Sequence, residues 1–142
     1  LKRAMQLLLY PMAALYVFAG YSHLANPSFF VAIVPPDLPE PELLNVASGL
    51  AEIVLGVFLL EPRTRIFAAW GVIALLIAVF PANVYVATAN VGMPGGEPGT
   101  GDAFANWIRL PFQAVLIVWA WWYTRPEAST ARAPAPDEAL GS

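Results

Sequence analysis

The stretch Pro41–Glu61, PELLNVASGLAEIVLGVFLLE, is long and apolar enough to cross a lipid bilayer, yet Glu52 stands near its middle. An ionisable side chain at that depth costs roughly a few kcal/mol and usually faces a protein interior or a wet cavity. The segment therefore predicts a membrane-spanning helix with a narrow polar seam. At about 100° per residue, five residues fall on that seam: Asn45, Ser48, Gly49, Glu52 and Gly56.

The composition of the whole chain agrees with this prediction. Of its 142 residues, 58% are hydrophobic and only 12% are charged, whereas about a quarter of the residues in a soluble domain are charged. The sequence therefore predicts an all-α fold, a four-helix transmembrane bundle that forms one domain over residues 1–124. Residues 125–142 are rich in proline and alanine and predict a disordered cytoplasmic tail. The expected helices cover about residues 4–24, 42–60, 66–90 and 103–124.

The connection between the first two blocks, residues 25–41, differs from an ordinary loop. Its prolines forbid a regular spanning helix, while Phe29, Phe30, Ile33 and Val34 keep a short apolar turn between them. We expect an interfacial or partly re-entrant lid, which is tolerated where its backbone meets protein or water. An ordinary loop with a few exposed apolar side chains is the alternative. The prolines are Pro27, Pro35, Pro36, Pro39 and Pro41.

The charged residues predict the orientation in the membrane. The first and third connections hold acidic residues and no lysine or arginine. The positive-inside rule then places both termini in the cytoplasm. Six of the seven cations lie at the N-terminus, in the second connection or at the C-terminus: Lys2, Arg3, Arg63, Arg65, Arg125 and Arg132.

Several function classes are excluded by the residue inventory. The chain has no cysteine and His23 is its only histidine, so thiolate chemistry, iron–sulfur ligation and bis-histidine haem ligation by this chain alone are excluded. The few cations form no nucleic-acid footprint. Glu52 and His23 are the only general acid/base candidates, so we do not expect an enzyme that acts alone, and no metal site is expected.

A second helix repeats the polar pattern of the first. Asn106, Arg109 and Gln113 have the i, i+3, i+7 spacing of Asn45, Ser48 and Glu52. Both helices enter the membrane from the same side, so the matched positions lie at similar depths, about 5, 9 and 15 Å from the helix start. This predicts a Glu52–Arg109 ion pair flanked by amides and hydroxyls. His23 and Asn83 approach the same level from the other two helices.

Two interpretations of this polar layer remain open. Paired charges and amides can simply hold the helices together and fix their register. Alternatively, the layer is a small amphipathic pocket for a quinone head group, a lipid or a similar molecule. For His23, near a helix end, a solvated or capping role stands beside a chemical one.

Several motifs, taken together, resemble the bacterial DoxX-like family of small membrane proteins over roughly residues 10–124. The resemblance implies a four-helix membrane bundle in the inner membrane. Better-known relatives are subunits associated with thiosulfate:quinone oxidoreduction and with amine dehydrogenase maturation, and a distant animal relative is an assembly chaperone for nicotinic receptors. The motifs are His23 with Pro27, the Ser48-Gly49…Glu52…Gly56 set, Pro62…Arg65, Phe80-Pro81-Ala82-Asn83, and Arg109-Leu110-Pro111-x-Gln113.

These observations predict an accessory subunit of a membrane redox system that binds a quinone or another amphipathic ligand. The alternative is a non-catalytic assembly, chaperone or structural subunit that docks on a larger membrane complex. Expected partners are the lipid bilayer, a quinone or lipid-like molecule, and a protein partner or a second copy of the chain. The cofactor itself is not identified by the sequence. The candidate ligand-binding residues are Glu52, Arg109, His23, Asn45, Ser48, Asn83, Asn106 and Gln113.

Overall fold

The computed structural model describes residues 1–92 and 97–126, so most of the predicted tail, residues 127–142, lies outside the described residues. Throughout the described part the regular structure is α-helical, without a strand. The elements are α1 (Lys2–Leu7), α2 (Leu9–Ala25), α3 (Pro27–Val31), α4 (Pro41–Leu60), α5 (Arg65–Thr88) and α6 (Ala103–Trp122).

Four helices are long and apolar enough to cross a membrane: Lys2–Ala25, which joins α1 and α2, and then α4, α5 and α6. This confirms the predicted all-α fold with four candidate spans. The third span ends at Thr88, two residues before the expected end, because Asn90 has a left-handed backbone with φ 47°. A residue in that conformation stops an α-helix.

The first span is interrupted at Leu8, which separates α1 from α2. Pro11 follows three residues later. Proline has no N–H to donate to the Leu7 carbonyl, and its ring crowds that carbonyl. The Leu7 carbonyl therefore loses its helical hydrogen bond at the junction, while Leu8 keeps a helical backbone.

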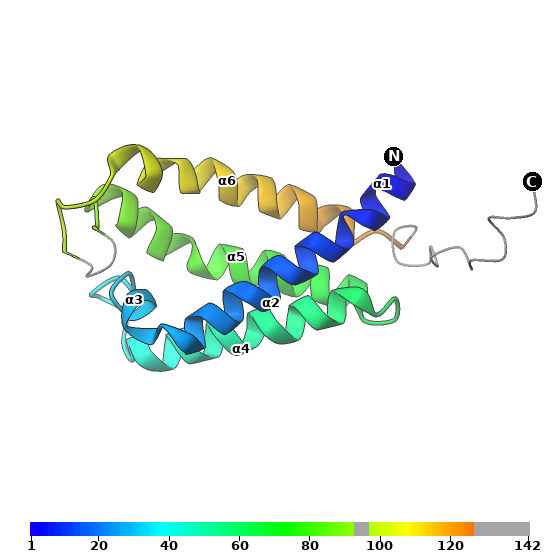
Figure 1. Ribbon diagram of the computed structural model, residues 1–142, viewed down its shortest axis with the longest axis horizontal. Helices are drawn as coiled ribbons and strands as arrows, with labels where there is room; N and C mark the ends of the chain where they lie inside the picture. The colour runs from blue at the N-terminus through cyan, green and yellow to red at the C-terminus, as the bar shows by residue number, and fades with distance from the viewer. Residues whose placement is uncertain (93–96, 127–142) are drawn as a thin grey trace, which may run out of the picture.

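The helices pack in a definite order (Figure 1). α2 packs on α4, α4 on α5, and α5 on α6, while the short α3 packs against α2 and α4. The main apolar core joins residues of all four spans, including Met12, Leu59, Val72 and Ala120. Many large apolar side chains elsewhere on these helices point outward. Such a surface is compatible with contact with a lipid bilayer.

Glycines bring α2 and α4 into backbone contact. Gly20 of α2 faces Gly49 of α4, and an added Cβ at Gly20 would run into the carbonyl oxygen of Gly49. Further along, a Cβ at Gly56 would lie 2.9 Å from the carbonyl oxygen of Ala13. Small residues at such crossings allow the close helix approach that stabilises membrane bundles.

The two ends of the bundle carry opposite charge. One end, here called the terminal end, holds Lys2, residues 61–64 and the end of α6 with Arg125. The other, the loop end, holds residues 26–40, 89–92 and 97–102 (Figure 1). Apart from Arg109, the described lysine and arginine residues lie at or near the terminal end, and the acidic residues Asp37, Glu40, Glu97 and Asp102 lie at the loop end.

Arg65 closes the terminal end of α4. Its guanidinium donates to the carbonyl oxygens of Leu59 (2.8 Å) and Leu60 (3.2 Å), and the residue is only 5% exposed. The last carbonyls of a helix have no partner within it. This arginine satisfies two of them, and its role therefore extends beyond the membrane-orientation charge assigned from the sequence.

Candidate functional site

The candidate site lies between α2 and α4 near the loop end. His23 stands in the last turn of α2, and Asn45 and Glu52 stand seven residues apart on α4, so both project from one face of that helix. The nearest pair of charged-group atoms, His23 Nε2 and Glu52 Oε2, are 3.4 Å apart. The two side chains are only 17% and 14% exposed. The structure thus brings three of the predicted site residues together.

Asn45 determines which ring nitrogen of His23 carries a proton. The Asn45 amide nitrogen donates to the His23 carbonyl oxygen (2.9 Å), and its Oδ1 lies 2.7 Å from His23 Nδ1. If the Asn45 amide were reversed, its oxygen would face the His23 carbonyl oxygen, and two acceptors would repel each other. Asn45 Oδ1 is therefore the acceptor and His23 Nδ1 the donor of the second bond. In a neutral ring with this tautomer, Nε2 carries no hydrogen.

With this tautomer the His23–Glu52 pair holds one proton, on the imidazole or on the carboxyl, although Nε2 and Oε2 do not meet in hydrogen-bond geometry. Nε2 without a hydrogen and an ionised carboxylate would repel each other at 3.4 Å. The pair is favourable when the imidazole is protonated beside a carboxylate, or when the carboxyl is protonated beside a neutral imidazole. Either state holds one exchangeable proton, which makes the pair a proton donor or acceptor for a bound molecule.

Tyr16 adds a polar atom to this site that the sequence analysis did not select. Tyr16, Gly20 and His23 lie on one face of α2 by their spacing, and α2 packs on α4, which carries Glu52. Within the described residues, the Tyr16 hydroxyl and Glu52 Oε2 are buried and have no hydrogen-bond partner. The i, i+4, i+7 spacing was the available signal, but tyrosine on a packed face is ordinary in a core.

Two features of α3 shape the approach to this cluster. The Phe30 ring stacks on the His23 imidazole, with ring centroids 3.8 Å apart and an interplanar angle of 21°. A recess of about 680 Å³ lies between α3 and α4, and Asn45 is part of its wall. Asn45 therefore connects the recess to the buried imidazole through a direct hydrogen bond.

The predicted Glu52–Arg109 pair does not form. Within the described chain, the ion pair that Glu52 makes is with His23, and Arg109 is half-buried on α6. α4 packs against α2 and α5, whereas α6 packs against α5. Equal depth along two helices is insufficient for a contact when those helices are not neighbours, and this is the physical reason for the difference.

Gln113 and Asn83 form a separate cluster between α5 and α6. Gln113 donates to the carbonyl oxygen of Leu76, and its side-chain oxygen accepts from the Asn83 amide at 2.5 Å. The contact lies beside Pro81, which has no N–H for the carbonyl of Ile77. Both polar ends of Gln113 are satisfied within the protein, so this cluster serves the packing of the bent helix.

Asn106 has a similar structural role at the loop end. Its amide donates to Asn90 Oδ1 (3.1 Å) and to the Val91 carbonyl (3.2 Å), and Asn90 in turn donates to the Gly101 carbonyl (2.9 Å). These bonds hold the α5–α6 connection against α6.

Ser48 is half-buried beside Gly49, one turn from Glu52. The predicted single polar layer is therefore three separate clusters, with Arg109 outside them.

No group of three or more histidine, aspartate or glutamate side chains in the described ranges could hold a metal ion. The site offers instead one imidazole–carboxyl pair, a phenol hydroxyl and an amide. These groups can donate and accept hydrogen bonds and exchange a proton with an organic head group.

Comparison with known proteins identifies a family. Residues 12–124 match the family described as "Domain of unknown function (DUF8561)". The match includes all four candidate spans except the start of the first, and the chain therefore belongs to this family. No curated protein and no solved structure matches the chain.

Proposed function

We propose that this member of the DUF8561 family binds an amphipathic molecule of the quinone type at the His23–Glu52 pair, as an accessory subunit of a membrane redox system. The observation that supports this most is the pair of buried polar atoms, Glu52 Oε2 and the Tyr16 hydroxyl, that have no hydrogen-bond partner among the described residues. A buried polar group left unsatisfied costs about 1–3 kcal/mol. A head group that bonds to both atoms would recover that free energy.

The chemistry of the cluster suits a quinone and its quinol. A quinone carbonyl accepts a hydrogen bond, as from the Tyr16 hydroxyl, and a quinol hydroxyl donates one, as to Glu52. Reduction of a quinone to a quinol consumes two electrons and two protons. The His23–Glu52 pair lies where it can relay protons, and a protein partner would supply the electrons, since the chain has no cysteine and one histidine.

The recess between α3 and α4 supplies a route for the apolar tail. Its wall includes Val31, Ala32 and Val46 as well as Asn45, and Asn45 bonds to His23, so in this proposal the tail lies in the recess and the head group reaches the pair beyond Asn45. In this proposal, residues 26–40 are the lid over the site, because Phe30 covers the His23 ring. Opening would separate these two stacked rings.

The orientation follows from the charge of the two ends. The cations of the terminal end favour placement of both termini in a bacterial cytoplasm, by the positive-inside rule. The His23–Glu52 pair would then lie in the outer half of the cytoplasmic membrane. The resemblance to DoxX-like proteins implies the same membrane, the bacterial inner membrane.

A role in assembly is the second candidate, and one observation favours it. Asn45 bonds to both the ring and the backbone of His23, and Gly20 meets Gly49 at the same crossing. This is also how two helices are fixed in register. In that case the cluster stabilises the bundle, and the outward apolar surfaces dock on a larger complex.

Analysis of the molecules that copurify with the protein distinguishes the two candidates. The protein would be extracted mildly from native membranes and its bound quinones quantified, beside Glu52→Gln and a matched control, Glu61→Gln. Glu61 is an exposed residue at the opposite end of α4, so the control makes the same change on the same helix.

We expect about one quinone-type molecule per chain in the parent protein and in Glu61→Gln, and a loss of roughly tenfold in Glu52→Gln, which corresponds to about 1.4 kcal/mol. Trace amounts that do not change in Glu52→Gln would refute ligand binding at this pair. Such a result, together with a stoichiometric protein partner, would favour assembly.

A further inference from the structure

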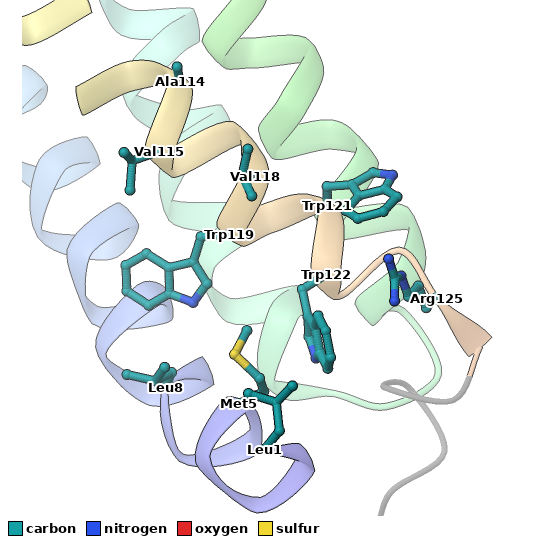
Figure 2. A pocket seen from close by; sticks show the side chains of 10 residues that line it. All are labelled: Leu1, Met5, Leu8, Ala114, Val115, Val118, Trp119, Trp121, Trp122 and Arg125. Carbon is teal, nitrogen blue, oxygen red and sulfur yellow. The ribbon is translucent and has the colours of Figure 1, made fainter. Parts of the chain in front are cut away.

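A second apolar groove lies at the terminal end, far from the His23–Glu52 pair. It has a volume of about 710 Å³ and separates the start of the first span from the second half of α6. Figure 2 shows Met5 and Leu8 on one side and Val118, Trp119 and Trp122 on the other. The volume falls in the range of about 300–1,000 Å³ that is usual for small-molecule sites.

The length of the groove matches one leaflet of a bilayer. Along α6, the lining begins at Ala114 and continues to Trp122 at the helix end. At about 1.5 Å per residue this is about 12 Å, and half of a hydrocarbon core of about 30 Å is about 15 Å. The groove therefore extends from the membrane surface to near the midplane, which is the extent of a single acyl chain.

The end of the groove at the membrane surface carries a cation in a fixed position. The guanidinium carbon of Arg125 lies 4.2 Å from the centre of the Trp121 ring and 5.1 Å from that of Trp122. Stacking on aromatic rings occupies the face of a guanidinium and leaves its N–H edges for an oxyanion. Lys2 and Arg3 are nearby in the chain, one turn before Met5.

The two features together select a ligand class. The groove has the length and the apolar lining to hold one acyl chain of a leaflet. A guanidinium at the membrane surface recognises a phosphate through paired hydrogen bonds. Among the described residues, no carboxylate forms an ion pair with Arg125. The excess of cations at this end favours a lipid whose head group has a net negative charge over one whose head group is zwitterionic.

We infer that this groove binds one anionic phospholipid of the leaflet at the terminal end, with an acyl chain between α1 and α6 and its phosphate on Arg125. The site is independent of the proposed quinone-type site, since it uses different helices and the opposite end of the bundle. A lipid seated there would add to the contacts between α1 and the end of α6, among them the bond from the Tyr123 hydroxyl to the Met5 carbonyl (2.5 Å).

Native mass spectrometry tests this inference. The protein would be released from vesicles that contain equal amounts of phosphatidylglycerol and phosphatidylcholine. We expect one retained phosphatidylglycerol per chain in the parent protein. Arg125→Gln should lower the preference for that lipid about fivefold, whereas Arg63→Gln, which removes a cation at the same end but outside the groove, should leave it unchanged. Val118→Trp should fill the groove and abolish retention.

The control for Val118→Trp is Val57→Trp, on an exposed apolar part of α4, which should retain the lipid. Quenching of tryptophan fluorescence by brominated phosphatidylglycerol, measured on the parent protein, supplies a readout that needs no variant, since three tryptophans line the groove. Equal retention of both lipids, equal effects of Arg125→Gln and Arg63→Gln, or quenching equal to that by brominated phosphatidylcholine would each overturn the inference.

Discussion

Replacing Gly20 by alanine should force α2 and α4 apart at the crossing that holds the candidate site. The new Cβ would run into the carbonyl oxygen of Gly49 and would lie 2.7 Å from Ile53 Cγ1 and 2.9 Å from the Ile53 backbone nitrogen. Carbon atoms pack favourably at about 3.5–4.0 Å. Two of the three obstacles are backbone atoms of α4, so the clash is relieved by movement of a helix and not by rotation of a side chain.

The expected magnitude follows from two opposing effects. Overpacking of this kind costs about 1–3 kcal/mol, and alanine in place of a helical glycine returns up to about 1 kcal/mol. Because the clash is with backbone atoms, the upper part of the overpacking range, about 2–3 kcal/mol, applies, and the net loss of unfolding free energy should be about 1–2 kcal/mol. Gly71→Ala is the matched control, because a Cβ there meets only the tip of the Leu55 side chain, which can move, so its net effect should be near zero.

Reversible unfolding in mixed detergent micelles, followed by circular dichroism, measures both variants against the parent protein. His23 follows Gly20 on α2, and Glu52 follows Gly49 on α4. Moving the two helices apart should therefore also separate His23 from Glu52 and reduce any ligand retention at that pair. The reasoning would be refuted by a Gly20→Ala protein that is as stable as Gly71→Ala.

Three further predictions concern polar groups inside the bundle. Gln113→Leu removes the partner of Asn83 and a donor to the backbone of α5, and should lower the unfolding free energy by about 1–3 kcal/mol; an unchanged thermal midpoint in detergent contradicts this. Arg65→Met removes charged hydrogen bonds to the end of α4, and should speed amide hydrogen exchange in its last turn, whereas Arg63→Met should not. Glu52→Gln, measured without ligand, should keep or raise the thermal midpoint, because it removes a buried carboxylate oxygen that has no hydrogen-bond partner among the described residues. If this variant lowers the midpoint as much as Gln113→Leu does, Glu52 has a structural role.

The four spans were predictable because their signal is local. An apolar run of bilayer length identifies a span whatever its neighbours are, and all four helices are found close to where the hydropathy places them. The break at Leu8 was not predicted, although Pro11 was visible in the sequence. A proline near a helix start is often tolerated, so its effect depended on the detailed path of the chain.

The site was predictable only in part, because a contact between helices depends on which helices are neighbours. The polar stripe placed Asn45 and Glu52 on one face of α4, and in the structure both lie beside His23. Depth alone suggested Arg109 as the partner of Glu52, but the chain packs α4 against α2 and α5. Periodicity gives the face and the depth of a residue, and it contains no information about the order of helices around a bundle.

Photolabelling with a photoreactive quinone analogue, followed by peptide mapping, shows directly whether a quinone binds at the His23–Glu52 pair. We expect label on the segments around His23 and Phe30 and around Asn45 and Glu52. Unlabelled quinone should compete with it, and the label should fall about tenfold in Glu52→Gln and stay unchanged in Glu61→Gln. Label spread over the outward faces of the spans, without competition and without an effect of Glu52→Gln, would contradict a ligand site at the His23–Glu52 pair.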